Sequence, residues 1–170
     1  MKPALMVIDM QKAWYKGASR ASMDAACSYV NAAVAAFRAR GLPVVWVQHI
    51  DEDDEAVPGA PGFDLIDALK PLEGEPRIEK RYGNAFTKTG CRDLLAGLGV
   101  DAVVLTGYCA EYCVLSTCRG AADLDLTAIL LRGALASGVE KHIRFVERVN
   151  DVVSLGALMA IIKPLDGQAR

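Results

Sequence analysis

The stretch "DAVVLTGYCAEYCVLSTCRG" (Asp101–Gly120) runs from a compact apolar segment through a glycine into a segment with helical spacing. Its first part, Asp101–Gly107, predicts a buried strand because its apolar residues are consecutive. After the glycine, Val114, Cys118 and Ala121 recur at intervals that place side chains on one face of a helix. A buried strand that leads directly into an amphipathic helix is typical of α/β proteins.

The same alternation of apolar runs and amphipathic stretches continues along the chain. Further strands are predicted at Ala4–Asp9, Val44–Ile50, Glu75–Lys80, Leu126–Leu131 and Val152–Val153. Helices are predicted from about Ser22, at Asp64–Lys70, at Cys91–Leu98, across Val139–Val149 and from Ser154. Because the strands are apolar on both faces, they indicate a parallel sheet that is covered by helices on each side. We therefore expect an α/β fold with one domain over residues 1–170, a three-layer αβα sandwich with a central, mostly parallel, six-stranded Rossmann-like sheet.

Composition limits the classes of partner. The chain has 170 residues, of which 52% are hydrophobic and 24% charged, and its formal net charge is −2 with both signs interspersed. Such a surface has no electrostatic footprint for nucleic acid or for an anionic membrane. We expect a small-molecule enzyme or a protein-interaction module.

The N-terminal apolar run does not resemble a signal peptide, because Asp9 and Gln11 interrupt it and no small-residue cleavage site follows. We therefore expect a cytoplasmic protein with no membrane-spanning segment. Thiols stay reduced in that compartment, and an odd number of cysteines, five, does not suggest a disulfide framework.

Chemistry-bearing residues follow three of the predicted strands. Asp9 ends the first, Lys80 ends the third, and a cysteine-rich turn follows the fourth. In open parallel sheets the ligand crevice lies outside the carboxyl ends of the strands. These residues are therefore expected to converge on one edge of the sheet.

The cysteines of that turn have several possible roles. Three residues separate Cys109 from Cys113, but no second ligand pair completes a structural zinc site. The spacing also differs from the Cys-x-x-Cys redox motif, although a redox role for the pair stays open. Cys118 and Cys27 lie on apolar helix faces, and with Cys91 they are predicted to be buried packing residues.

Cys113 differs in its position at the turn from a strand end into a helix. A helix N-terminus and a nearby cation such as Lys80 can lower the pKa of a thiol. With Asp9 as a proton carrier, Cys113 becomes a candidate nucleophile. Position alone leaves a plain packing role equally open.

Three motifs add a resemblance to a known family. "MVIDMQKAW" (6–14), "EKRYGNAF" (79–86) and "TGYCAEYCVLSTCRGAADLD" (106–125) occur in this order. Together they resemble the motifs of the isochorismatase-like cysteine hydrolases: an Asp-x-Gln after the first strand, a lysine followed six residues later by phenylalanine, and a glycine-led turn before a Cys-Val pair.

The resemblance implies a catalytic triad of Asp9, Lys80 and Cys113. It also implies a cis peptide at Tyr108–Cys109, after which the backbone N–H groups of Cys109 and Cys113 would form an oxyanion hole. The expected substrate-pocket residues are Gln11, Trp14, Tyr82, Phe86, Tyr108 and Glu111. The Glu111 carboxylate has a second interpretation, as a solvated residue at a helix start.

The sequence departs from the family pattern at several positions near the expected crevice. Nicotinamidases of this kind carry an aspartate and several histidines after the second strand, whereas this chain offers only His49 and Asp51 there. His142 is predicted on a later helix and is not expected to reach the crevice. We therefore expect no metal and no cofactor. The other departures are Ala110, Asn84, Arg132 and Gly133.

The resulting hypothesis is a metal-independent cysteine amidohydrolase, a hydrolase of non-peptide C–N bonds. It would cleave a small amide, ureido or carbamoyl substrate through a thioester and release ammonia. The alternatives are a non-catalytic or regulatory member of the same fold, which acts as an interaction protein, and a nicotinamidase-like enzyme. The resemblance also implies a homo-oligomer, a dimer or tetramer.

Overall fold

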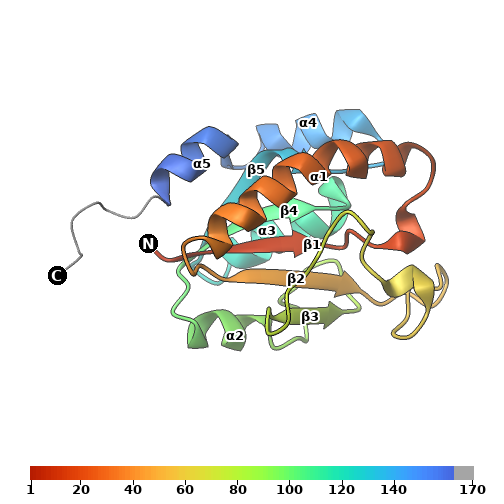
Figure 1. Cartoon of the computed structure of the whole chain (residues 1–170), viewed down its shortest axis with the longest axis horizontal. Helices are drawn as coiled ribbons and strands as arrows, with labels where there is room; N and C mark the ends of the chain where they lie inside the picture. Colours follow the sequence, from red (N-terminus) through yellow and green to blue (C-terminus); the bar gives the residue numbers. More distant parts are fainter. Residues whose placement is uncertain (163–170) are drawn as a thin grey trace.

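The computed structural model describes residues 1–162 and has a central sheet with helices on both faces (Figure 1). The six strands are all parallel, in the order β3-β2-β1-β4-β5-β6. The strands are β1 (Pro3–Ile8), β2 (Val44–His49), β3 (Arg77–Lys80), β4 (Ala102–Gly107), β5 (Thr127–Leu135) and β6 (Val152–Val153). The α-helices are α1 (Gly17–Arg38), α2 (Cys91–Gly97), α3 (Leu115–Ala122), α4 (Glu140–Arg148) and α5 (Leu155–Ile161). The expected α/β sandwich is confirmed. Within residues 1–162, no helix combines the length and apolar character that crossing a membrane requires.

The two faces of the sheet bury two separate hydrophobic cores. In β1, Leu5 and Val7 pack into the core beneath α1 and α5, while Met6 and Ile8 pack into the core beneath α2, α3 and α4. Every residue of β1 is buried, because alternate side chains point to opposite faces and both faces are covered. This explains why the strand reads as a continuous apolar run.

The strand order reverses beside β1. From β1 the sheet runs through β2 to β3 on one side, and through β4 to β6 on the other. Crevices in open α/β sheets form at such a reversal, outside the carboxyl ends of the strands. The residues that follow β1, β2, β3 and β4 therefore surround one site.

One predicted helix and two predicted boundaries need correction. The helix expected at 64–70 is absent. In its place a 3₁₀ turn (Pro61–Phe63) leads to an antiparallel bridge between Leu65 and Gln11, and pairing with the chain after β1 keeps this segment extended. Helix α1 begins at Gly17, five residues before the expected Ser22. Strand β5 continues to Leu135, four residues past its predicted end.

Gly107, the last residue of β4, touches the backbone of β1. Its φ is +114°, and a Cβ built there would lie 2.1 Å from the carbonyl oxygen of Ile8. A backbone atom cannot move aside as a flexible side chain can, so only glycine fits. This contact sets where the cysteine-rich turn leaves the sheet.

We predict that Gly107→Ala lowers the free energy of unfolding by about 2–4 kcal/mol, because overpacking adds to the cost of a positive φ. The matched control is Gly41→Ala, where φ is also positive but no atom lies within 4 Å of the added Cβ. That variant should lose only about 1 kcal/mol. Urea unfolding of both proteins measures the difference, and equal losses would contradict the steric explanation.

Candidate active site

Asp9, Lys80 and Cys113 meet at the carboxyl edge of the sheet. Lys80 Nζ donates a hydrogen bond to Asp9 Oδ2 at 2.6 Å, and both side chains are almost completely buried. A carboxylate oxygen of Asp9, a ring nitrogen of His49 and the sulfur of Cys113 all lie within 4.8 Å of one another. The structure thus brings the three residues of the expected triad together.

The backbone after β1 places the Asp9 carboxylate. Asp9 has a φ of +48°, a conformation that aspartate tolerates better than most residues. Its N–H donates to the carbonyl of Val47, which ties it to β2. The buried amide of Gln11 clamps the same junction, since it donates to the carbonyl of His49 and accepts from the His49 N–H. Gln11 therefore holds the site's backbone together.

Burial dominates the electrostatics of this cluster. Burial raises the pKa of Asp9, against the opposing effect of Lys80. Burial, reinforced by the nearby Asp9 carboxylate, raises the pKa of Cys113 to about 12, again against Lys80. The sequence-based prediction of a lowered thiol pKa is therefore wrong, because desolvation of the thiolate outweighs one cation. At neutral pH Cys113 rests as a thiol.

His49 joins the ion pair from the end of β2. Its Nδ1 lies 3.0 Å from Lys80 Nζ, and an ammonium can only donate, so Nδ1 accepts. Burial and then the charge of Lys80 lower the pKa of His49, which keeps the ring neutral with its proton on Nε2. Asp9, His49 and Cys113 could in principle ligate a metal ion. A bound cation would have to compete with Lys80, which already bonds two of these groups.

A pocket of about 500 Å³ opens above Asp9 and Cys113. Trp14 and Tyr108 form one wall, with stacked rings whose centroids are 6.3 Å apart, and Tyr112 adds a third aromatic ring. Of the expected pocket residues, Trp14, Tyr108 and Glu111 line this space.

Three expected pocket residues lie elsewhere. Gln11 is buried at the strand junction. Tyr82 is largely exposed and accepts a hydrogen bond from Lys88. Phe86 packs against the core beneath α2 and α3. The loop after β3 therefore packs against the core and contributes none of the pocket-lining residues.

Glu111 is not the solvated carboxylate that a helix start suggests. Its side chain is only 14% exposed and is bonded by the Cys109 thiol at 2.9 Å, the Ser137 hydroxyl at 3.0 Å and His142 Nδ1 at 2.6 Å. Burial alone would raise the pKa of Glu111, but these hydrogen bonds together lower it. Glu111 is therefore ionised at neutral pH.

His142 lines the same pocket, contrary to the expectation that it would not reach. It is 31 residues from Glu111 in sequence, and no spacing rule links them. The added residues of β5 carry the chain back over the turn after β4, where Ala110 N–H bonds the Ala136 carbonyl. Helix α4 begins just beyond and brings His142 above the pocket.

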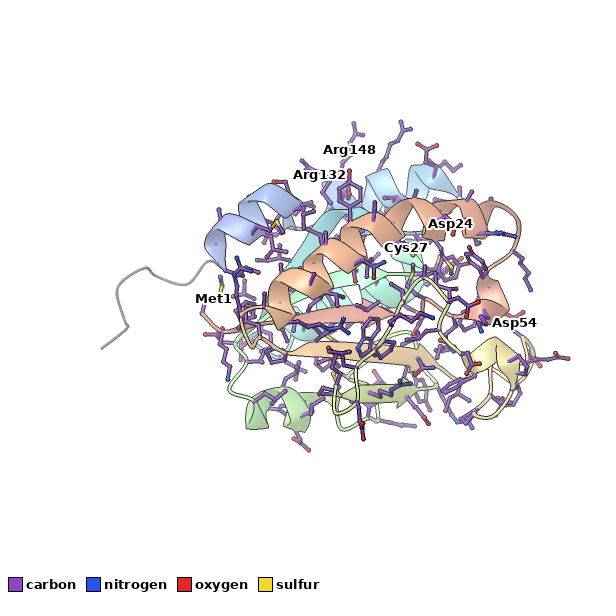
Figure 2. All side chains as sticks on the ribbon, viewed as in Figure 1. Met1, Asp24, Cys27, Asp54, Arg132 and Arg148 are labelled. Atoms are coloured by element: carbon purple, nitrogen blue, oxygen red, sulfur yellow. The ribbon has the colours of Figure 1, made fainter. Side chains whose placement is uncertain are left out.

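Two departures from the family pattern lie outside the pocket. Arg132 is exposed within β5, 3.9 Å from Glu147, on the outer surface beside α4 (Figure 2). Asn84 packs against Gly120, where any Cβ would collide with it, and its Oδ1 accepts from Phe86 N–H. Neither residue lines the pocket above Cys113.

The turn after β4 contains a cis peptide bond between Tyr108 and Cys109. The N–H of Cys109 makes none of the hydrogen bonds found among residues 1–162. Residues Ala110–Val114 then form one turn of π-helix before α3, with Cys113 in it. Cys27, Cys91 and Cys118 are buried free thiols, as expected.

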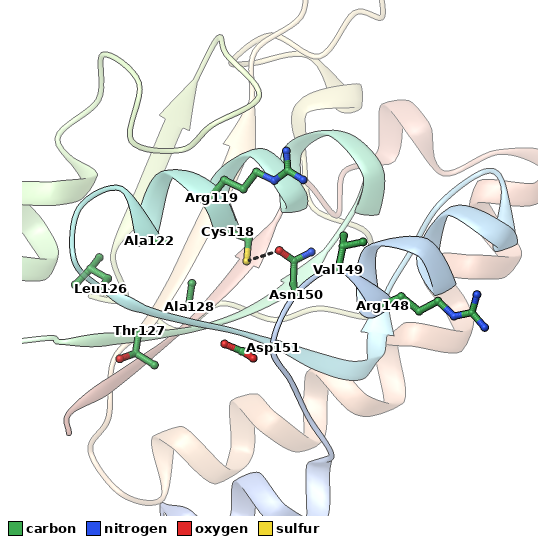
Figure 3. Close-up of a pocket in the computed structure, with 10 residues that line it drawn as sticks. All are labelled: Cys118, Arg119, Ala122, Leu126, Thr127, Ala128, Arg148, Val149, Asn150 and Asp151. Carbon is green, nitrogen blue, oxygen red and sulfur yellow. Dashed lines mark hydrogen bonds between the residues drawn. The ribbon is translucent and has the colours of Figure 1, made fainter.

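A second hollow, of about 590 Å³, lies between α3, β5 and the end of α4 (Figure 3). Its lining includes Arg119, Arg148 and Cys118, whose thiol contacts Asn150 Oδ1 at 3.7 Å. It shares no lining residue with the pocket above Cys113. Although larger, it offers no paired base and nucleophile.

Comparison with known proteins places this geometry in a family. The sequence matches the isochorismatase domain over residues 3–154. The chain belongs to the isochorismatase family. An isochorismatase family protein of Bacillus subtilis is 31% identical over 142 residues, which cover 81% of this chain and 79% of that protein. Members of this family are hydrolases, which confirms the expectation of an enzyme.

Solved structures agree with this assignment. An isochorismatase-like hydrolase from Alkaliphilus metalliredigens is 25% identical and superposes with a TM-score of 0.87 over 95% of this chain and 97% of that one. N-carbamoylsarcosine amidase from Thermoplasma acidophilum is 28% identical, with a TM-score of 0.80 over 91% of this chain and 97% of that one. The ureidoacrylate amidohydrolase of Klebsiella pneumoniae is 27% identical over 169 residues, covering 77% of this chain and 72% of that enzyme.

The raised thiol pKa predicts an alkylation profile without a plateau near neutrality. Iodoacetamide should modify Cys113 at a rate that climbs about tenfold per pH unit from about pH 7 to about pH 9.5. Burial is the main cause of the raised thiol pKa, and Asp9→Asn removes the charge that adds to it. Alkylation at about pH 8 should therefore accelerate, by about tenfold per pKa unit lost. Peptide mass spectrometry, with Cys113→Ala as the assignment control, measures both. Slower alkylation in Asp9→Asn would contradict this electrostatic account.

Proposed function

We propose that this protein is a cysteine amidohydrolase that cleaves the C–N bond of a small amide, ureido or carbamoyl compound and releases ammonia. The observation that carries the proposal is the buried Asp9 carboxylate, held by Lys80, beside the Cys113 thiol on the floor of a pocket. A base next to a protonated nucleophile is the arrangement that acyl transfer requires.

In the first half-reaction, Asp9 removes the proton from the Cys113 thiol as the sulfur attacks the carbonyl carbon. Because both pKa values are raised, the proton moves during attack and no resting thiolate is needed. The carbonyl oxygen becomes an oxyanion, and backbone N–H groups at Cys109 and Cys113 would stabilise it, each by about 2.7–4 kcal/mol. Asp9 then returns the proton to the leaving nitrogen, and ammonia departs.

In the second half-reaction, water replaces ammonia. Asp9, ionised again, takes a proton from water as the water oxygen attacks the thioester carbon. Collapse of the adduct breaks the C–S bond, and the proton on Asp9 returns to the sulfur. One water is consumed for each ammonia released, and Cys113 ends as a thiol.

Lys80 would supply the fixed positive charge of the site. Its ammonium lies 2.6 Å from Asp9 Oδ2 and stabilises the ionised form of that carboxyl. The same charge also acts on the Cys113 thiol and favours its thiolate form. We propose that this cation takes the electrostatic role that a metal ion has in other hydrolases, so that the reaction proceeds without a metal.

Two relatives support the choice of bond. The ureidoacrylate amidohydrolase and N-carbamoylsarcosine amidase, at 27% and 28% identity, act by name on a ureido and a carbamoyl compound. Both groups place a carbonyl next to an NH₂ leaving group. The pocket of about 500 Å³ has room for a molecule of that size.

We predict that ammonia release from a panel of small amides, ureides and carbamoyl compounds depends on the proposed triad. Cys113→Ala should reduce the rate at least about 10³-fold because the nucleophile is gone. Asp9→Asn should lose about 10²–10⁴-fold, since the amide cannot carry the proton. A coupled ammonia assay measures both rates. Brief reaction followed by hydroxylamine should trap the enzyme-bound acyl group, as a hydroxamate from an amide and as an N-hydroxyurea from a ureido or carbamoyl compound.

Cys118→Ala is the matched control, because it removes a buried thiol outside the pocket. It should release ammonia at nearly the rate of the unmodified protein. Turnover that survives in Cys113→Ala would overturn the proposal, as would release of ammonia without any acyl group trapped by hydroxylamine.

A further inference from the structure

We propose that the pocket selects amides whose non-reacting end carries a positive charge. This inference names the substrate class for the site described above and so rests on the proposed function. It follows from three features of the pocket: its charges, an unpaired acceptor on its floor, and its aromatic wall.

The pocket is lined by three acidic side chains and two histidines. Asp9, Asp51 and Glu111 contribute carboxylates, and among residues 1–162 no lysine or arginine lines this space. Lys80 offsets Asp9 from beneath. Within the described part of the chain, Glu111 has only His142 as a cationic partner, and Asp51 accepts only from the backbone N–H groups of Asp53 and Asp54. The pocket therefore keeps a net negative charge even when His142 is protonated.

Nearby cations are committed to other partners. Arg81 pairs with Glu52 at 2.5 Å, and Lys16 lies 3.8 Å from Asp54. Neither side chain lines the pocket. A substrate carboxylate would lose its hydration there without gaining a cation, which disfavours anionic compounds.

The floor of the pocket offers an acceptor that lacks a donor. Asp9 is 99% buried and lines the pocket, and its Oδ1 has no hydrogen-bond partner within the described chain, whereas Oδ2 binds Lys80. Leaving a buried carboxylate oxygen unpaired is costly. Besides the neighbouring Cys113 thiol, a bound molecule that donates N–H, as the NH₂ of an amide does, would satisfy this oxygen.

The aromatic wall suits a cation at the other end of such a molecule. Trp14 stacks on Tyr108, and its indole N–H donates to Asp54 Oδ2 at 2.8 Å, which fixes the ring. The faces of tryptophan and tyrosine attract ammonium groups electrostatically. Together with Asp51 and Glu111, this wall forms a site for an organic cation above Cys113.

Thiol-modifying reagents of matched chemistry test the inference without any turnover. Cys113 is treated with trimethylammonioethyl, methyl and sulfonatoethyl methanethiosulfonates, which transfer a cationic, a neutral and an anionic group. Fragment-ion mass spectrometry assigns modification to Cys113, and each rate is divided by the rate for a free small thiol. We expect the normalised cation-to-anion ratio to be at least about tenfold, because acidic pockets concentrate cations to that degree.

Charge variants separate a local effect from net charge. Asp51→Asn and Glu111→Gln should each lower the ratio about threefold, whereas Asp123→Asn, which changes net charge equally at the exposed end of α3, should leave it unchanged. The ratio in the unmodified protein should also shrink as ionic strength rises from about 0.02 to about 0.5 M. A ratio at or below that of the free thiol would overturn the inference, whether or not the protein hydrolyses amides. If the unmodified protein releases no ammonia but its normalised cation-to-anion ratio is high, the proposed function alone is overturned.

Discussion

The buried ion pair between Lys80 and Asp9 is the interaction on which the rest of the site depends. Removing one partner of such a pair leaves an uncompensated buried charge and costs about 3–5 kcal/mol. The sheet supplies the alignment that makes the pair possible, because His49 and Lys80 end neighbouring strands in register and Asp9 is tied to Val47. The most buried part of the fold thus contains its most reactive charges, and the backbone around it has little freedom to move.

This burial decides which chemistry is available to Cys113. A thiol beside a carboxylate in a desolvated site does not ionise at rest, so the site differs from those that rely on a preformed thiolate. The same desolvation makes Asp9 a stronger base than an exposed aspartate. The raised pKa of Asp9 therefore acts against the raised pKa of the thiol in the proton transfer between them. The electrostatics of the site therefore favour the transfer of one proton between Cys113 and Asp9 over a permanently ionised thiol.

Much of this arrangement could be predicted from the sequence because it follows from rules of parallel sheets. Asp9, Lys80 and Cys113 each follow an apolar run, and the carboxyl ends of such strands meet at one edge. The direction in which the thiol pKa shifts could not be predicted, because it depends on burial of Cys113 by segments distant in the sequence. His142 was also missed, because its position depends on how far β5 continues past its apolar run. The segment at 64–70 has helical apolar spacing, but pairing with Gln11 overrides that preference.

The family's fold and the pocket's charge have different origins in the chain. The fold of this chain depends on apolar strands and on close backbone contacts such as that of Gly107 with β1. The overall fold is shared with solved structures that are only 25–28% identical. The walls of the pocket come from the turn after β4, the loop after β2 and the start of α4, where residues can change without disturbing the core. Glu111 and Asp51 lie on such segments, whereas Asp9 and Lys80 are fixed by strand register. In this chain the sheet therefore fixes the Asp9–Lys80 pair, while the loops at its carboxyl edge set the charge of the pocket wall.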